Sequence, residues 1–428
     1  MMSITPILYW TDFLVYTILF GILFFLYSVR KKEGWKRFIR TFSKKPLYQV
    51  SVVILIFYGL VGFMDSLHFK DNENRQNVKS LLDVFLPYEN LPEETYSAPF
   101  AIESYDPVVK KLANGSSEQT YARLNYAGQH LLRPQDKASD IAWRSGGGVL
   151  GGLLLTLVFY LTLKFICKKR LSRTIWITLG TLFCILTVIY FFVGHYHILG
   201  TDKVGRDVFY LSIKSIRTGL IIGTVTTFVM LPFAVLLGMG AGYFRGWVDD
   251  IIQYIYTTLS SVPGILLIAA AVLSLQVKIE QDPELRLLVL CIILGVTSWT
   301  GLCRLVRGET LKLREMDFVQ AAISLGVSRS KIMMKHILPN LGHIIIITLV
   351  LDFSGLVLAE AILSYVGVGV APTSYSWGNL INASRLEMAR DPMVWWSLLG
   401  AFILMFVLVF SANLFSDAVQ KALDPRRG

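Results

Sequence analysis

The segment from Asp317 to Asn340 reads DFVQAAISLGVSRSKIMMKHILPN and lies between two long apolar runs. It is too polar and too punctuated to cross a bilayer, so we expect it to lie outside the hydrocarbon. Asp317 with Gln320 fits a capping box at the start of a first short helix, and Gly326 is suited to end that helix in the left-handed conformation. The segment therefore predicts a bent pair of helices, called here the elbow (residues 317–340).

The second half of the elbow carries its own boundary signals. Ser328 can cap a second helix, and Pro339 is expected to end it. Val327 and Ile332 stand at the two positions of a hydrophobic staple for that helix. An amphipathic segment that lies on the lipid surface is the alternative, which the basic residues of this half would suit.

The elbow resembles the cytoplasmic coupling loop of permease subunits of bacterial type I ATP-binding-cassette (ABC) importers. The family pattern is Glu-Ala-Ala, three residues, Gly, and further on Ile-Leu-Pro. The resemblance implies that the matching positions contact an ATPase subunit; they are Gln320, Ala321, Ala322, Gly326, Ile337, Leu338 and Pro339. Gln320 replaces the usual acidic residue, which keeps the hydrogen-bonding reach without the charge. Ala321 and Ala322 are expected to let the partner's surface approach closely.

Composition places the chain in the membrane. It has 428 residues, 54% of them hydrophobic, with a mean hydropathy of +0.55, above the roughly 45–50% apolar content of soluble domains. The net charge of +11 collects in short loops between apolar runs, so it reports membrane orientation and not nucleic-acid binding. The four cysteines fall in or beside apolar runs, so no disulfide framework is implied.

Nine apolar runs are long enough to form transmembrane helices, which predicts an all-α polytopic membrane protein. They cover residues 7–28, 47–63, 149–167, 174–193, 220–242, 251–275, 287–305, 343–366 and 394–418. Pro263 and Gly264 predict a kink in the sixth run. Basic clusters after the first and third runs predict cytoplasmic loops there, which puts the N-terminus outside and the C-terminus in the cytoplasm.

The same runs divide the chain into four parts. These are two N-terminal helices with a basic cytoplasmic loop (1–64), an extracytoplasmic insert (65–147), a third extra helix (148–173) and a core of six helices (174–428). By resemblance this core is the type I ABC importer permease. The insert has mixed charges and scattered prolines but thin apolar content, so a packing or partner-docking role is expected for it.

A second motif follows the fourth run, where residues 197–208 read HILGTDKVGRDV. It is similar to the segment Leu-Gly-Thr-Asp, two residues, Gly-Arg-Asp of the dipeptide, oligopeptide and nickel branch of these importers. The matching positions are Gly200, Thr201, Asp202, Gly205, Arg206 and Asp207. The two aspartates bracket a tight turn, and Arg206 can pair with either of them. A phosphate-binding loop is excluded because no Gly-Lys-Ser/Thr follows.

Other polar residues stand out against their surroundings. Asp352 and Glu360 lie in the eighth run, where acids face a protein interior or an aqueous cavity, so both are candidates for the pathway or for helix packing. Glu360 is expected to hydrogen-bond structurally more than to touch substrate. Trp377 is expected as an interface anchor, docking contact or packing residue. His195 and His197 are not expected to bind metal, because no recognised ligand set completes the pair.

The resemblance implies a permease subunit without catalytic residues, cofactor or metal of its own, in the cytoplasmic (inner) membrane. Its implied partners are a second, different permease chain, two ATPase subunits that use ATP and Mg²⁺, an extracytoplasmic substrate-binding protein and membrane lipid, with no nucleic acid. The chain lacks a Walker phosphate loop of its own. Short peptides are the expected substrate, with nickel or another small solute as alternatives.

Two other classes of protein fit the sequence less well. An ion-coupled secondary carrier would need inverted repeats with paired interrupted helices, and no counterpart to the kink at Pro263 is evident. A membrane-anchored scaffold or enzyme built on the insert would need a catalytic constellation there, but the insert offers His68 and His130 without a recognisable nucleophile motif.

Overall fold

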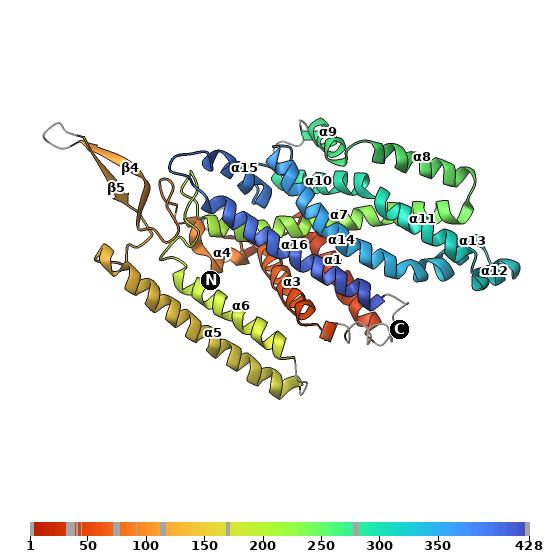
Figure 1. The fold of residues 1–428 in the computed structure, drawn as a ribbon, viewed down its shortest axis with the longest axis horizontal. Helices are drawn as coiled ribbons and strands as arrows, with labels where there is room; N and C mark the ends of the chain where they lie inside the picture. Colours follow the sequence, from red (N-terminus) through yellow and green to blue (C-terminus); the bar gives the residue numbers. More distant parts are fainter. Residues whose placement is uncertain are drawn as a thin grey trace. The chain divides into compact units, whose positions relative to one another are not determined.

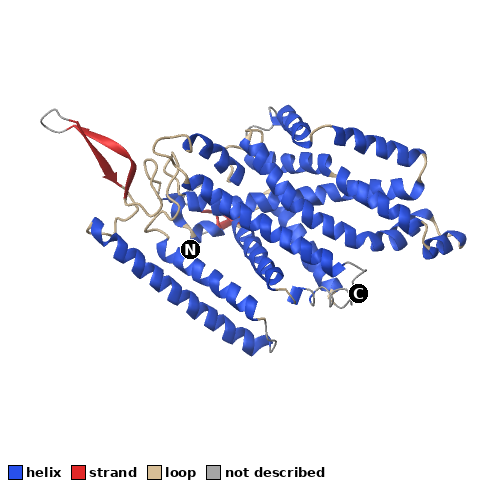
Figure 2. Cartoon of the chain, viewed as in Figure 1, coloured by secondary structure: helices blue, strands red, loops and turns tan. Residues whose placement is uncertain are grey.

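The computed structural model describes residues 4–30, 39, 42–43, 45–71, 78–90, 92–111, 117–167, 172–276 and 282–423. Helices dominate this part of the chain, and its strands all lie between residues 4 and 123 (Figure 2). The predicted all-α polytopic membrane class is confirmed, with two small sheets added. The basic residues at 31–38 and 168–170 and the tail at 424–428, which helped predict the orientation, lie outside the described residues.

Within the described ranges, seven helical segments are long and apolar enough to cross a membrane, or eight if one bent pair counts as a span. The seven are Pro46–Asp65, Pro134–Phe165, Arg173–Phe192, Val208–Phe244, Pro283–Arg314, Arg329–Tyr365 and Trp396–Ala422. The bent pair is α8 (Trp247–Ser261) and α9 (Gly264–Gln276), which turn by 88° at the predicted kink. In α1 (Trp10–Val29) the shorter stretch Trp10–Gly21 is apolar.

The chain divides into two compact units. The first comprises Met1–Leu8, Lys45–Thr218 and Tyr375–Ser411, and the second comprises Tyr9–Lys44, Gly219–Ser374 and Ala412–Gly428. Two long helices, α7 (Val208–Phe244) and α16 (Trp396–Leu423), contribute residues to both units. The four ranges predicted from the sequence follow chain order instead, and they stay a prediction.

The first unit combines helices with the two sheets. Strands β1 (Ile4–Ile7), β2 (His68–Asp71) and β3 (Val78–Ser80) form an antiparallel sheet in that order, and β4 (Glu103–Lys111) pairs with β5 (Ser117–Arg123) in a hairpin (Figure 1). The helices are α3 (Pro46–Asp65), α4 (Leu81–Phe85), η1 (Pro87–Asn90), η2 (Pro134–Asp136), α5 (Lys137–Cys167), α6 (Arg173–Phe192) and α15 (Trp377–Glu387). Helix α5 begins well before residue 148, where the sequence predicts the third extra helix to start.

The second unit contains helices and no strand among its described residues. Besides α1, α8 and α9, it contains α10 (Pro283–Ser298), α11 (Thr300–Arg314), α12 (Asp317–Ser324), α13 (Arg329–Ile332), the π-helical turn η3 (Met333–Ile337) and α14 (Leu338–Tyr365). Two buried apolar clusters form its core. One, which includes Ile221 and Leu290, packs α7, α9 and α10, with α1 against them. The other, which includes Met239, Trp299 and Ile337, joins α7 and α11 to the elbow.

Glycines allow α5 and α6 to pack closely (Figure 1). A Cβ atom at Gly148 would lie 2.6 Å from the Cα of Val188, and one at Gly152 would lie 2.4 Å from the Cα of Cys184. These two glycines are four residues apart, which is the spacing that brings helix backbones together in membranes. The α5–α6 pair therefore depends on the missing side chains.

We expect Gly152→Leu to destabilise the protein by about 1–3 kcal/mol, because the two backbones must separate to admit the side chain. The apparent Tm of the purified protein in detergent measures the effect. The matched control is Gly146→Leu on the same helix, where an added Cβ meets nothing within 4 Å. Equal Tm values for the two variants would contradict this packing.

Candidate functional site

The first helix of the elbow ends as the sequence predicts. Gly326 adopts a left-handed backbone conformation with φ of +75°. The N–H of Val327 donates to the carbonyl of Ala322 at 3.1 Å, and the N–H of Gly326 donates to that of Ile323 at 2.9 Å. These are the two hydrogen bonds of a Schellman motif, so the backbone itself sets the angle between the two limbs of the elbow.

The inner face of the elbow is part of the core of the second unit. Val319, Ala322, Ile332 and Ile337 are buried in one cluster with residues of α7 and α11. Val327 packs against the same cluster, so it and Ile332 occupy the predicted staple positions. The elbow is thereby held as a rigid extension of the helices that flank it.

Three details of the elbow differ from the prediction. Ala322 is 6% exposed and faces the core, whereas Ala321 faces outward, because the helical period puts residues 319 and 322 on the same buried side. Gln320 does not form a capping box; it is exposed, and its Nε2 donates to the carbonyl of Arg314 at 2.9 Å. Pro339 does not end the second helix: it lies in the first turn of α14, which follows directly on the π-helical turn η3 within the helical segment Arg329–Tyr365.

The outer face of the elbow and the residue before it present large apolar side chains. The exposed fractions are 51% for Met316, 44% for Phe318, 40% for Ile323, 82% for Leu325 and 55% for Met334. Gly326 and Pro339 are also exposed and Leu338 is half-buried, whereas Ile337 is fully buried. Apolar side chains exposed on one short segment are typical of a surface that another protein or the membrane covers.

An ion pair that the sequence analysis missed braces the helices beside the elbow. Arg307 on α11 donates to both carboxylate oxygens of Asp249 on α8, at 2.5 Å from Nε and 2.7 Å from Nη2. Such bidentate pairs fix geometry as well as charge. No local signal in the sequence connects these residues, which are 58 positions apart.

The predicted motif at 200–207 forms a tight turn in the first unit. Asp202 accepts hydrogen bonds from the backbone N–H of Val204 and of Arg206, both at 2.9 Å, and pairs with the Arg206 side chain, which donates from Nε at 3.0 Å. Of the two carboxylates expected for Arg206, the fold therefore selects Asp202. Asp207 instead accepts from the N–H of Tyr210 at 2.7 Å, at the start of α7.

The insert lies directly on this turn, a contact that the sequence analysis did not foresee. Thr201 donates from its hydroxyl to the carbonyl of Thr95 at 2.8 Å and accepts from the N–H of Ser97 at 2.7 Å. A Cβ atom at Gly205 would lie 1.8 Å from the carbonyl oxygen of Glu93, and one at Gly200 would lie 2.2 Å from that of Ser97. The two motif glycines therefore allow the backbone of the insert to approach.

A buried charged cluster fastens the insert to the turn. The Nδ1 atom of His197 lies 2.8 Å from Asp207, and its Nε2 atom lies 3.4 Å from Glu93. Burial alone would lower the pKa of His197, but the two carboxylates raise it to about 9. Burial would raise the pKa of Glu93, while the nearby His197 imidazole and hydrogen bonds from three backbone N–H groups lower it below its usual value. At neutral pH an imidazolium thus joins two carboxylates.

Lys214, near the start of α7, holds a second buried cluster that the sequence analysis missed. Its Nζ lies 2.8 Å from Asp83 on α4 and 3.3 Å from Asp65 at the end of α3. Tyr210 donates to Asp83 at 2.9 Å. A charged residue in an apolar helix needs partners of this kind. The position of Lys214 next to an apolar run was therefore the one sign in the sequence that could have predicted a buried ion pair.

The remaining predicted residues have packing environments. Glu360 is buried and accepts from the hydroxyl of Ser364 at 2.7 Å, as expected for a structural role. Trp377 is 1% exposed and donates from Nε1 to the carbonyl of Ser212 at 3.0 Å, so it packs α15 on α7 and is not a surface anchor. Asp352 is half-buried on α14.

Comparison with known proteins identifies the family. A family model described as "Binding-protein-dependent transport system inner membrane component" matches residues 234–428. The oligopeptide transport system permease protein OppC of Haemophilus influenzae is 33% identical over 231 residues, which are 54% of this chain and 71% of that protein. The chain belongs to this family. The predicted resemblance to ABC importer permeases is thus confirmed.

Two further relatives of this permease are also named as transport system permease proteins. The dipeptide transport system permease protein DppC of Lactococcus lactis is 32% identical over 230 residues, covering 54% of this chain and 64% of that protein. The glutathione transport system permease protein GsiD of Pectobacterium atrosepticum is 31% identical over 230 residues, covering 54% of this chain and 73% of that protein.

We expect His197→Gln to destabilise the permease by about 3–5 kcal/mol, because it leaves two buried carboxylates without their shared cation. The measurement is the apparent Tm in detergent. Arg206→Gln is the control: the Arg206 side chain is 52% exposed, so its ion pair should contribute about 0–1 kcal/mol. A smaller loss for His197→Gln than for Arg206→Gln would show that the buried cluster does not hold the insert.

Proposed function

We propose that this permease carries short peptides across the cytoplasmic membrane and is driven by separate ATPase subunits through the elbow. The observation that supports the coupling is the elbow's construction, with Ala322 and Ile337 buried in the permease's own core and Leu325 exposed. A segment fixed on one face and apolar on the other can pass a displacement of its partner to α11 and α14. The substrate class is supported by the relatives, which are named for oligopeptides, dipeptides and glutathione.

The proposed assembly contains a second, different permease chain, two ATPase subunits that bind ATP and Mg²⁺, and a substrate-binding protein that delivers the peptide. The elbow and the C-terminus face the cytoplasm, and the N-terminus and the insert face outward. ATP hydrolysis belongs to the partner subunits in this proposal, and this chain supplies the path and the coupling surface. The elbow must make different contacts in the two states of the ATPase pair, since only differential affinity shifts an equilibrium.

The test of coupling is Leu325→Asp, which puts a charge on the most exposed apolar side chain of the elbow. We expect ATPase subunits to bind this variant about tenfold more weakly or worse, which corresponds to 1.4 kcal/mol. Co-purification and substrate-stimulated ATP hydrolysis are the measurements. Leu132→Asp is the matched control, because Leu132 is 95% exposed in the insert. Equal losses for both variants, or none for Leu325→Asp, would overturn the coupling role.

Because Ala322 is buried, a bulky residue there would disturb the core as well as any interface. Ala321→Trp is the cleaner steric test: it faces outward, so it should block docking while leaving the Tm unchanged.

Uptake of labelled di-, tri- and pentapeptides by membrane vesicles that contain the whole assembly tests the substrate. Uptake of nickel in place of peptide would refute the peptide proposal and leave the coupling role standing.

A further inference from the structure

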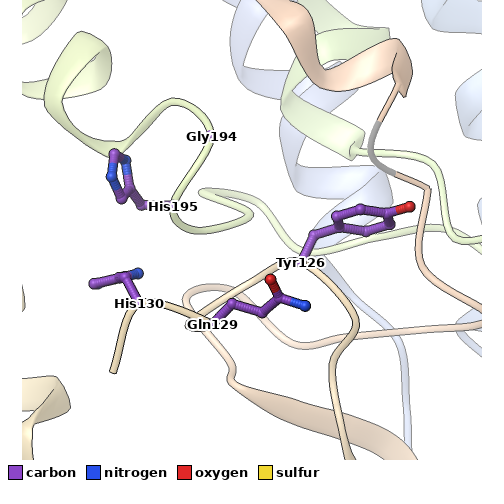
Figure 3. A pocket seen from close by; sticks show the side chains of 5 residues that line it. All are labelled: Tyr126, Gln129, His130, Gly194 and His195. Atoms are coloured by element: carbon purple, nitrogen blue, oxygen red, sulfur yellow. The ribbon is translucent and has the colours of Figure 1, made fainter. Parts of the chain in front are cut away.

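A pocket in the first unit brings two histidines together. Tyr126, Gln129, His130, Gly194 and His195 line a cavity of about 470 Å³, with the two imidazoles on one side and Tyr126 and Gln129 on the other (Figure 3). The ring centroids of the two histidines are 5.0 Å apart. The sequence places His195 beside His197, but the fold buries His197 between carboxylates and brings His195 to His130 of the insert.

Each imidazole has one nitrogen already engaged by a group that can only accept a hydrogen bond. The Nε2 atom of His130 lies 2.8 Å from the carboxylate of Asp140, and the Nδ1 atom of His195 lies 3.1 Å from the carbonyl of Val193. Those nitrogens must therefore carry the protons. In the neutral form, Nδ1 of His130 and Nε2 of His195 are left with free lone pairs.

We infer that His130 and His195 form a two-histidine site for a divalent transition-metal ion such as Cu²⁺ or Zn²⁺. A carboxylate or carbonyl that orients the far nitrogen of each imidazole is the usual second shell of histidine ligands to metals. The 5.0 Å between the ring centroids, with the ring planes at 85°, is compatible with one ion held at about 2.0–2.1 Å by one nitrogen of each ring.

The ligand atoms decide which ions suit the pocket. Imidazole nitrogens favour copper and zinc, whereas calcium and magnesium take oxygen ligands. The amide nitrogen of Gln129 donates to the carbonyl of Asn125, which leaves its side-chain oxygen for the pocket. No cluster of three His, Cys, Asp or Glu side chains suited to a metal occurs among the described residues, so water completes the coordination. The ion is therefore exchangeable, and its open positions can take a further ligand.

The test is a titration of the purified full-length permease in detergent with Cu²⁺ alone, after purification without a polyhistidine tag. We expect one bound equivalent whose electron paramagnetic resonance spectrum shows hyperfine structure from two imidazole nitrogens. His130→Gln and His195→Gln should each weaken binding at least about tenfold. Asp140→Asn should weaken it about 10- to 100-fold, as is typical when the second shell is lost.

His343→Gln is the matched control, because the Nδ1 atom of His343 likewise lies near a backbone carbonyl, that of Asn340 at 2.8 Å, but His343 does not line the pocket. It should leave Cu²⁺ binding unchanged. Equal binding by the wild-type chain and the His130→Gln/His195→Gln double variant would overturn the site. If a variant loses its native Tm, chemical modification of the wild-type chain is the second test. Bound Zn²⁺ should protect His130 and His195, but not His343, from modification by diethyl pyrocarbonate. Modification of His130 and His195 at the same rate with and without Zn²⁺ would refute the site. The elbow plays no part in this site, so its failure leaves the coupling proposal intact.

Discussion

A membrane interior offers no water to backbone N–H and C=O groups, so every such group must find its partner within the protein. The long apolar runs meet this constraint as helices, and both described sheets lie outside them, between residues 4 and 123. Side chains obey the same rule. Lys214 is buried beside Asp65 and Asp83, and Glu360 is buried beside Ser364. Irregular backbone lies between the helices, and two such places are the bend of the elbow and the turn at 200–207.

These two segments differ in how far the rest of the chain covers them. The turn at 200–207 is covered by the chain itself: Thr201 bonds to the backbone of the insert, and His197 joins Asp207 to Glu93. The elbow is buried only on its inner side, where its helices share a core with α7 and α11. On its outer side, Phe318 and Leu325 are exposed. The turn at 200–207 is thus covered by the chain's own residues, whereas the outer side of the elbow leaves apolar side chains exposed.

Local chemistry was predictable and distant contacts were not. Gly326 and Pro263 were placed correctly, because few residues other than glycine end a helix left-handed and because proline removes a helical hydrogen bond. Pro339 was misplaced, since proline suits both the first turn of a helix and the region after its end. The burial of Ala322 could not be predicted, because the sequence did not show which face of α12 would pack against the core. Nothing in the sequence connects Glu93 with Gly205, which are brought together only by the fold.

The number of candidate spans after the elbow relates its compartment to that of the end of α16, whatever the bend at Pro263 does. With 15 and 13 residues, α8 and α9 are each about 20 Å long, shorter than the roughly 30 Å of hydrocarbon, so neither helix is long enough to cross it alone. Only two candidate spans of the described chain follow the bent segment of the elbow, those that contain α14 and α16. An even number of crossings returns a polypeptide to the compartment it left. Two crossings would place the end of α16 in the same compartment as the elbow, and this relation does not involve the α8–α9 pair, which precedes the elbow in the chain.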